Sequence, residues 1–158
     1  MEGNIYLRRA DREDVELCFK WANEPAVRAN SFNTETILWE NHQKWFEKVL
    51  ADDGVCIYVL MQDNIPVGQV RLVFEDSKWQ ISYSIASAYR GQGYGKRILQ
   101  LAENELISNG CSGEKLYAEV KAHNTASQRI FNRLGYAELE SNHSNAYAYV
   151  KVIGEKEQ

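Results

Sequence analysis

Three glycines alternate within five residues near the middle of the chain, in the segment Arg90-Gly91-Gln92-Gly93-Tyr94-Gly95-Lys96. The preceding residues, 79–86, alternate between apolar and polar types, and apolar residues follow helical spacing over 98–107. Glycine allows positive φ and lets a ligand approach the backbone closely. Because a turn of this kind directs free N–H groups and a helix N-terminus at one point, the segment predicts an anion-binding loop.

Two well-known phosphate loops do not fit this segment. A Walker A loop would need Gly at position 90 and Ser or Thr at 97, where the chain has arginines. The dinucleotide fingerprint would need Gly at 96 or 98, where the chain has Lys96 and Ile98. A plain surface turn is the remaining alternative. It is disfavoured because turns rarely need three alternating glycines between Arg and Lys directly before a long helix.

The rest of the chain alternates between helix-like and strand-like patterns without a repeat or a linker. We expect one α/β domain of the α+β type over residues 1–158, with a mixed, mostly antiparallel sheet of about seven strands and about four flanking helices. Asp63-Asn64 predicts a two-residue hairpin turn, Asp11 with Asp14 predicts a helix start, and residues 26–37 show no regular pattern. The predicted strands are 5–8, 56–62, 65–74, 79–86, 116–120, 136–139 and 147–153, and the predicted helices are 12–23, 39–50, 98–107 and 125–134.

The composition argues against several classes of protein. With 18 basic and 22 acidic residues the net charge is −4, which disfavours nucleic-acid binding. The apolar runs are too short for a membrane helix, which needs about 20 residues, and the first residues do not resemble a signal peptide. Cys18, Cys56 and Cys111 show no metal-ligand spacing and no disulfide framework. We therefore expect a cytoplasmic protein that uses no metal.

Two motifs of the chain resemble the signatures of the GNAT acetyltransferase superfamily. The segment 90–95 matches the pattern Q/R-x-x-G-x-G/A, and the segment 124–136 matches N-x-x-A/S-x-x-x-Y/F-x-x-x-G-F/Y. A helix and a strand are predicted between the motifs, as that fold requires, and the resemblance covers nearly the whole chain. It implies a GNAT-like sheet and acetyl-CoA as co-substrate, with the acetyl group transferred to a primary amine.

The resemblance also implies which residues contact the cofactor. Backbone N–H groups over 92–96 would hold the pyrophosphate, and backbone groups near Ile85 and Ala86 would pair with the pantetheine arm. Asn124 would either contact the CoA arm or cap its own helix. Four basic residues would either contact phosphates or be solvated helix charges: Lys96, Arg97, Arg129 and Arg133. The cofactor set is Ile85, Ala86, Arg90, Gly91, Gln92, Gly93, Tyr94, Gly95, Lys96, Asn124, Phe131 and Arg133.

The transfer needs a group that takes the amine proton and N–H donors for the tetrahedral oxyanion. The candidate bases are Glu119, on the polar side of its strand, and His42. An exposed strand charge and a boundary residue of a helix are the respective structural alternatives. In many GNAT enzymes a Tyr in the last helix protonates the leaving thiolate, and this chain has Phe131 there. Tyr83 or Ser127 would donate that proton instead, unless the thiolate leaves without one.

The region between the first strand and the hairpin usually shapes the acceptor pocket in this family. Here it is dense in aromatic and amide side chains, which suit a sugar or a nucleotide. Helix packing is expected to bury Trp45 and Phe46. The predicted acceptor set is Trp21, Arg28, Asn30, Phe32, Asn33, Trp39 and His42.

Part of this region resembles one group of GNAT enzymes more than others. The W-x-N-x-x-x-V-R stretch, the following F-N pair and the I-x-W-E-x-H helix resemble enzymes that N-acetylate UDP-linked 4-amino-sugars, as in pseudaminic acid biosynthesis. The similarity to ribosomal-protein N-terminal acetyltransferases is weaker. We expect a small-molecule amine acceptor, foremost an amino-sugar nucleotide, and no nucleic-acid or membrane partner. The alternatives are a protein N-terminus as acceptor and a non-catalytic acyl-CoA-binding module, and the family makes a homodimer a candidate assembly.

Overall fold

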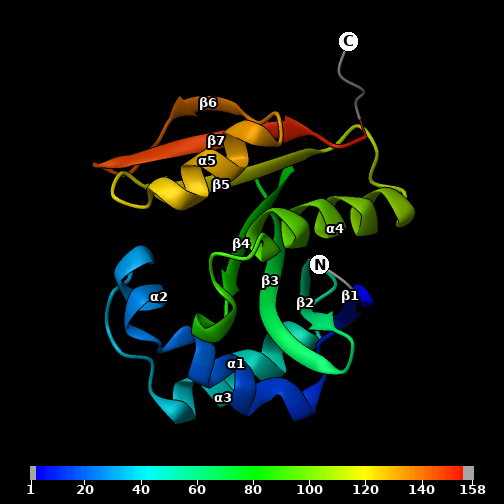
Figure 1. Ribbon diagram of the computed structural model, residues 1–158, viewed down its shortest axis with the longest axis vertical. Helices are drawn as coiled ribbons and strands as arrows, with labels where there is room; N and C mark the ends of the chain where they lie inside the picture. The colour runs from blue at the N-terminus through cyan, green and yellow to red at the C-terminus, as the bar shows by residue number, and fades with distance from the viewer. Residues whose placement is uncertain (1–2, 155–158) are drawn as a thin grey trace.

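One mixed sheet runs through the molecule and carries helices on both of its faces (Figure 1). The computed structural model describes residues 3–154. The seven strands over these residues follow the order β1-β2-β3-β4-β5-β7-β6, which confirms the predicted mixed, mostly antiparallel α/β sheet. They are β1 (Ile5–Arg9), β2 (Val55–Gln62), β3 (Ile65–Glu75), β4 (Lys78–Ile85), β5 (Lys115–Lys121), β6 (Ala137–Glu140) and β7 (Ala146–Val152).

Five α-helices and two short 3-10 helices lie within the same described residues. No helix found there combines the length and the apolar character needed to cross a membrane. The α-helices are α1 (Val15–Ala22), α2 (Pro25–Asn30), α3 (Trp39–Leu50), α4 (Tyr94–Ser108) and α5 (Thr125–Arg133). The 3-10 helices are η1 (Arg12–Asp14) and η2 (Ser87–Tyr89).

Each face of the sheet has its own apolar cluster. On one face Ile98 of α4 and Phe131 of α5 pack with Leu116 of β5. On the other face Phe46 of α3 packs with Ile57 of β2, next to α1. Because successive side chains of a strand point to opposite faces, the position of a residue along its strand decides which cluster or surface it joins. After the ligands that the sequence leads us to expect, the face that α4 and α5 cover is named the cofactor face, and the face that α1 and α3 cover is named the acceptor face.

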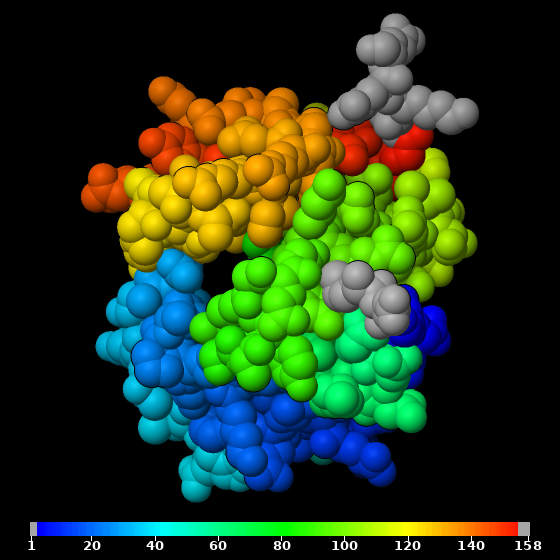
Figure 2. Space-filling model, viewed as in Figure 1, coloured from blue at the N-terminus to red at the C-terminus, as the bar shows by residue number. Residues whose placement is uncertain are grey.

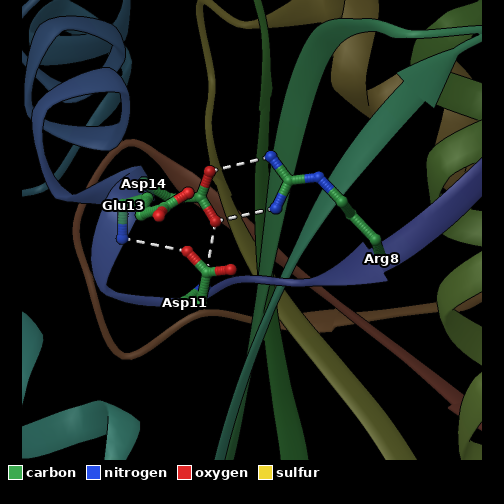
Figure 3. A network of polar contacts seen from close by, with 4 residues as sticks. All are labelled: Arg8, Asp11, Glu13 and Asp14. Atoms are coloured by element: carbon green, nitrogen blue, oxygen red, sulfur yellow. Dashed lines mark hydrogen bonds and ion pairs between the residues drawn. The ribbon is translucent and has the colours of Figure 1, made fainter.

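The predicted start of the first helix is confirmed by a polar network at the end of β1 (Figure 3). Arg8 donates two hydrogen bonds of 2.8 Å to the carboxylate of Asp14, whose residue is only 5% exposed. Asp14 also accepts from the backbone N–H of Asp11 at 2.9 Å, and the Asp11 side chain accepts from the N–H of Glu13. This reciprocal capping box satisfies donors that a helix start leaves free.

The prediction that residues 26–37 are irregular is wrong in its first part, where α2 forms. Pro25 occupies the first turn, where the missing N–H costs no hydrogen bond. Arg28 then donates to the carbonyl of Ala22 at 2.7 Å and to that of Asn33 at 2.8 Å, which fixes the helix against its flanking loops. A helix of six residues without a buried side chain has no apolar stripe, so periodicity could not reveal it.

The parallel contact between β4 and β5 is short. Two residue pairs join these strands, Trp79 with Leu116 and Gln80 with Tyr117, whereas the other neighbouring strands pair antiparallel. Beyond these pairs the strands separate at a wide angle (Figure 1). The second half of β4 and the second half of β5 therefore border an opening in the sheet, which we call the wedge.

Candidate functional site

The glycines of the loop before α4 serve two different structural purposes. Gly91 and Gly93 have φ values of +76° and +88°, in the left-handed region that favours glycine. A Cβ on Gly95 would instead lie 2.8 Å from Cδ1 of Ile130, so this glycine lets α4 pack closely against α5. Two glycines thus shape the loop, and the third one fixes how the two helices of the cofactor face meet.

The backbone of this loop offers a row of unused donors. The first N–H that follows the loop and has a partner is that of Arg97, which donates to the carbonyl of Gly93 at 3.3 Å. Within the described residues, the N–H groups of 91–96 make no backbone or side-chain hydrogen bond. The side chain of Tyr94 is buried and donates to Gln62, so Tyr94 can contribute only its backbone here. Unpaired amides at the start of a long helix fit a diphosphate.

Arg90 closes the edge of the loop instead of pointing freely into it. Its Nε donates to the carbonyl of Ile85 at 2.9 Å, and its Nη2 forms a 2.9 Å ion pair with Glu24. The N–H of Ala86 donates to the carbonyl of Val67 at 2.8 Å. Because alternate residues of an antiparallel strand face alternate sides, β4 then directs the backbone groups of residues 83 and 85 at the wedge. Ala86 therefore does not offer its N–H to a pantetheine arm.

The predicted cofactor residues of α4 and α5 fall into three kinds. Asn124 caps α5, since its side chain accepts from the N–H of Ser127 at 3.3 Å. Phe131 is 2% exposed and stacks on Tyr149 with a centroid distance of 5.4 Å, so it is a core residue. The third kind comprises the exposed candidates for phosphate contact at the loop and along both helices, which are Gln92, Lys96, Arg97, Arg129 and Arg133.

Two hydroxyl groups meet where the wedge borders α5. The Tyr83 hydroxyl of β4 and the Ser127 hydroxyl of α5 are 2.5 Å apart. The Tyr83 ring packs edge-on against Phe131, with centroids 6.2 Å apart. Burial raises the pKa of Tyr83, and the Ser127 hydrogen bond offsets this in part, so the phenol is protonated at neutral pH. The structure thus brings together the two residues that the sequence suggests as alternative acids.

Glu119 lies on the acceptor face of β5, as the strand alternation predicts. Its carboxylate oxygen Oε2 is 2.5 Å from His143 Nδ1 and 2.6 Å from the Ser141 hydroxyl, and Oε1 accepts from Tyr117 at 3.1 Å. Burial alone would raise the pKa of Glu119, but the hydrogen bonds from Ser141, His143 and Tyr117 outweigh it and hold the pKa below its usual value. Sequence reasoning missed Ser141 and His143, which follow Glu119 by 22 and 24 positions and carry no local pattern.

His42 occupies a different environment. It is 3% exposed and packs between α1 and α3 among the rings of Phe19, Trp45 and Phe46. Its Nε2 is 2.9 Å from the carbonyl of Val15, which can only accept, so Nε2 carries the proton. Burial lowers the pKa of His42, which keeps the imidazole neutral. His42 is therefore a structural histidine, buried away from solvent, and is neither a base nor an acceptor contact.

Two of the predicted acceptor residues, Arg28 and Asn33, hold the segment between α1 and α3 in place. The Arg28 guanidinium donates hydrogen bonds to backbone carbonyls and to the Ser31 hydroxyl, and the Asn33 side chain accepts one from the N–H of Glu35. Trp21 is 7% exposed in the core of the acceptor face. Trp39 is 37% exposed and packs edge-on against a neighbouring ring of α1.

Asn30 and Phe32 reach across to the other half of the sheet. Asn30 Oδ1 is 2.8 Å from Nε2 of His123, and the carbonyl of Ala29 accepts from Lys121 at 3.1 Å. The Phe32 ring stacks on His143, with centroids 4.0 Å apart. Figure 2 shows a hollow bounded by α2 (blue), the start of α5 (yellow) and the connection from β4 to α4 (green). These three contacts join α2 and the loop that follows it to the end of β5 and to the loops beside it.

The cysteines do not form a reactive group. Cys18 is 2% exposed, and burial raises its pKa to about 12. Cys56 is buried as well, and Cys111 is half-buried. A thiol nucleophile needs a lowered pKa and access to substrate, which Cys18 lacks.

The sequence model of the Acetyltransferase (GNAT) domain family matches residues 4–137. Among curated proteins, the [ribosomal protein bS18]-alanine N-acetyltransferase of Haemophilus ducreyi is 28% identical over 78 residues, which are 49% of this chain and 52% of that protein. The match thus spans about half the length of that relative.

Solved structures show the same architecture at low sequence identity. The AAC(6')-Ib structure with ribostamycin and coenzyme A superposes with a TM-score of 0.82 at 17% identity, over 94% of this chain and 93% of that one. The spermidine N-acetyltransferase of Vibrio cholerae, with CoA and spermine, superposes with a TM-score of 0.81 at 14% identity, over 94% and 95% of the chains. At this identity the likeness concerns the fold alone.

Proposed function

This chain belongs to the GNAT acetyltransferase family, and on that premise we propose that it transfers the acetyl group of acetyl-CoA directly to the primary amine of a small molecule. One observation carries the proposal. The wedge places a loop of unused amides and the Tyr83–Ser127 hydroxyl pair on the cofactor face, and the Glu119 carboxylate on the acceptor face. The activity is assigned to one domain over residues 1–158, in the cytoplasm and without a metal.

The backbone would bind the co-substrate. The N–H groups of 91–96 would hold the diphosphate at the start of α4, and the exposed Lys96 adds charge beside them. The backbone groups of residue 83 and the N–H of Ile85, which β4 directs at the wedge, would pair with the pantetheine arm, while the Ile85 carbonyl is held by Arg90. When bound, acetyl-CoA supplies an acetyl group on a thiolate leaving group, which no residue of the chain supplies.

The side chains would move the protons. Glu119 is ionised at neutral pH and accepts a proton from the acceptor amine, directly or through one water, while the nitrogen forms its bond to the acetyl carbon. As the carbon–sulfur bond breaks, Tyr83 gives its proton to the departing sulfur and recovers one through Ser127. Amine and thioester thus become amide and thiol without any further reactant.

The acceptor proposed is an amino-sugar nucleotide. Its support is the hollow at the end of the wedge, which contacts of Asn30 and Phe32 close on one side. A hollow that is bounded on one side fits a compact acceptor better than an extended peptide, which needs a groove open at both ends. The solved relatives named for aminoglycosides and spermidine also act on small amines. The similarity to the bS18-alanine acetyltransferase favours the second candidate, a protein N-terminus.

The test follows free thiol during incubation with acetyl-CoA and one of two acceptors, a UDP-linked 4-amino-sugar or a peptide with an N-terminal alanine. Incubation with buffer in place of an acceptor is the control. Thiol release with the sugar nucleotide above the buffer rate supports the proposal, and release only with the peptide replaces it by the second candidate. Calorimetry measures CoA binding in parallel. Tight CoA binding without turnover on a wide amine panel would identify a non-catalytic acyl-CoA-binding module, and light scattering of the same sample tests the predicted homodimer.

A further inference from the structure

Arg71 lies on the acceptor face, and no acidic side chain among residues 3–154 forms an ion pair with it. It belongs to β3, where it is paired with Ile57 of β2 and Ser82 of β4. Ile57 packs in the apolar cluster of the acceptor face, so the side chain of Arg71 lies on that face too. Over the described part of the chain, no hydrogen bond or ion pair reaches the Arg71 guanidinium. Its only close contact of note is with Trp45, whose ring centroid is 5.2 Å from Arg71 Cζ.

The position of Arg71 combines access with a crowded surrounding. The residue is exposed to solvent, yet desolvation by the surrounding protein, followed by the charge of Arg28, lowers its pKa. An arginine stays protonated there, because a guanidinium is not deprotonated in proteins. The prediction that helix packing buries Trp45 is wrong, because the residue is 36% exposed and lies beside Arg71.

The second cation nearby does not find a negative partner either. The Arg28 guanidinium is held by three backbone carbonyls and the Ser31 hydroxyl, all of them neutral. Lys121 donates to the carbonyl of Ala29 and lies over the Phe32 ring, again without a carboxylate. Three full positive charges therefore gather around the acceptor face of a chain whose net charge is −4. A guanidinium without a carboxylate partner and beside another cation attracts an anion from solution.

Arg71 and Glu119 lie on the same face of the sheet, on either side of the wedge. Arg71 is paired with Ser82 on the β4 side of the wedge, two residues beyond the last pair that joins β4 and β5, and Glu119 lies two residues beyond that pair on β5. Neighbouring strands are about 4.8 Å apart, so Arg71 and Glu119 are separated by roughly 10 Å before the wedge widens that distance. An acceptor of sugar size can span from one to the other.

We propose that Arg71 binds an anionic group of the acceptor, a phosphate or a carboxylate, while Glu119 takes the proton from its amine. The inference rests on the proposed function and deepens it. It selects amines that carry a negative charge on the same molecule and disfavours purely cationic polyamines and aminoglycosides. A guanidinium supports such recognition because it can give two parallel hydrogen bonds to one anion. The open alcohol of Ser82, between the two residues, is available to the acceptor as well.

The first experiment measures anion binding without any turnover. The protein is saturated with CoA, which fills the amide loop, and is then titrated in a calorimeter with inorganic pyrophosphate or with succinate. We expect one of these anions to bind, and to bind at least about tenfold more weakly in Arg71→Gln, with an intermediate effect in Arg71→Lys. Preference for pyrophosphate identifies a phosphate group, and preference for succinate identifies a carboxylate.

Arg9→Gln is the matched control for that titration. Arg9 also lies over a ring, with its Cζ 5.9 Å from the centroid of Tyr58, but it belongs to β1 at the far edge of the sheet. The control is expected to bind the anion as the unaltered protein does. Equal binding by the Arg71→Gln and unaltered proteins, or binding of neither anion by the unaltered protein, would overturn the assignment.

A second experiment compares glucosamine with glucosamine 6-phosphate as acceptors. We expect a lower KM for the phosphate, and Arg71→Gln is expected to raise that KM about tenfold or more while kcat and the KM for glucosamine change little. Equal effects of the substitution on both acceptors would contradict the proposal. If no amine of any kind is acetylated, the proposed function fails, and the titration still decides whether Arg71 binds an anion.

Discussion

The two sides of the wedge are built from different parts of the chain and by different means. On the cofactor face, one continuous segment, 90–96, supplies unused backbone N–H groups, and its glycines serve backbone geometry. On the acceptor face, side chains from β3, β5, α2 and the loop before β7 converge, and each depends on partners distant in sequence. A backbone site of this kind tolerates side-chain variation around it, whereas the acceptor site changes with almost every residue that lines it.

The largest functional effect is expected on the acceptor side. Glu119→Gln keeps the size of the side chain but removes the proton acceptor, so kcat is expected to fall about 100- to 1000-fold while the Kd for CoA stays unchanged. Stopped assays with saturating acceptor measure kcat, and calorimetry measures the Kd. Glu103→Gln is the control, because Glu103 pairs with Lys151 outside the wedge. A Glu119→Gln enzyme with full kcat would show that the amine loses its proton elsewhere.

The same substitution has a consequence for the pH profile. Because hydrogen bonds hold the pKa of Glu119 below its usual value, the carboxylate is already ionised throughout the neutral range. The rise of kcat/KM between neutral and alkaline pH should then follow the deprotonation of the acceptor amine. The midpoint of this rise should shift with the pKa of the amine used. The Glu119→Gln enzyme should keep the same midpoint and reach a lower maximum kcat/KM.

On the cofactor side the expected effect concerns binding. Gly93→Glu forces a side chain into a position with φ of +88° and puts a negative charge where the diphosphate would lie, so CoA should bind about 100-fold more weakly. Gly110→Glu is the matched control, since Gly110 has φ of +84° in open space beyond the end of α4. Both variants should lose similar thermal stability, but only Gly93→Glu should lose CoA affinity in calorimetry. Equal affinities would remove the diphosphate from this loop.

A smaller effect is expected where the two sides meet. Tyr83→Phe removes the phenol but leaves the Ser127 hydroxyl, so kcat should fall about tenfold, and the double variant with Ser127→Ala should fall further. Tyr149→Phe removes a comparable buried hydroxyl, whose hydrogen bond goes to Glu138, and should leave kcat unchanged. Full activity of the double variant would mean that the thiolate leaves without a proton.

The same contrast explains how much the sequence could predict. The sheet, the hairpin turn at Asp63-Asn64 and the glycine loop depend on local pattern and backbone geometry, which a single sequence carries. The helix α2, the partners of Glu119 and the role of Trp45 depend on contacts between distant segments, which no periodicity encodes. The sequence also predicts a candidate base at His42, which is buried, because a histidine on an amphipathic helix has the same spacing whether it is buried or catalytic.

The smallest effect on function is expected in the polar network of Arg8 and Asp14 at the end of β1, far from the wedge. The Asp14 carboxylate is buried and accepts two hydrogen bonds from Arg8, whose side chain is 35% exposed. Breaking a buried pair costs about 3–5 kcal/mol, and solvent at Arg8 reduces this, so Asp14→Asn should lower the free energy of unfolding by about 2 kcal/mol. Glu16→Gln, which breaks an exposed pair with Lys20, should cost less than about 0.5 kcal/mol.

The contribution of Asp14 to the free energy of unfolding depends on pH, and the direction of its pKa shift decides whether that contribution is lost at low or at high pH. Although burial raises the pKa of Asp14, its bonds to Arg8 and to the Asp11 N–H lower it further, so the folded pKa is below the unfolded one. The stabilisation is therefore complete above an ordinary aspartate pKa of about 3.9 and is lost as the pH falls through the folded value. Urea titrations of Asp14→Asn and unaltered protein should converge below about pH 4, while CoA affinity at pH 7 stays equal. A loss of CoA affinity would mean that the two halves are energetically coupled across the sheet.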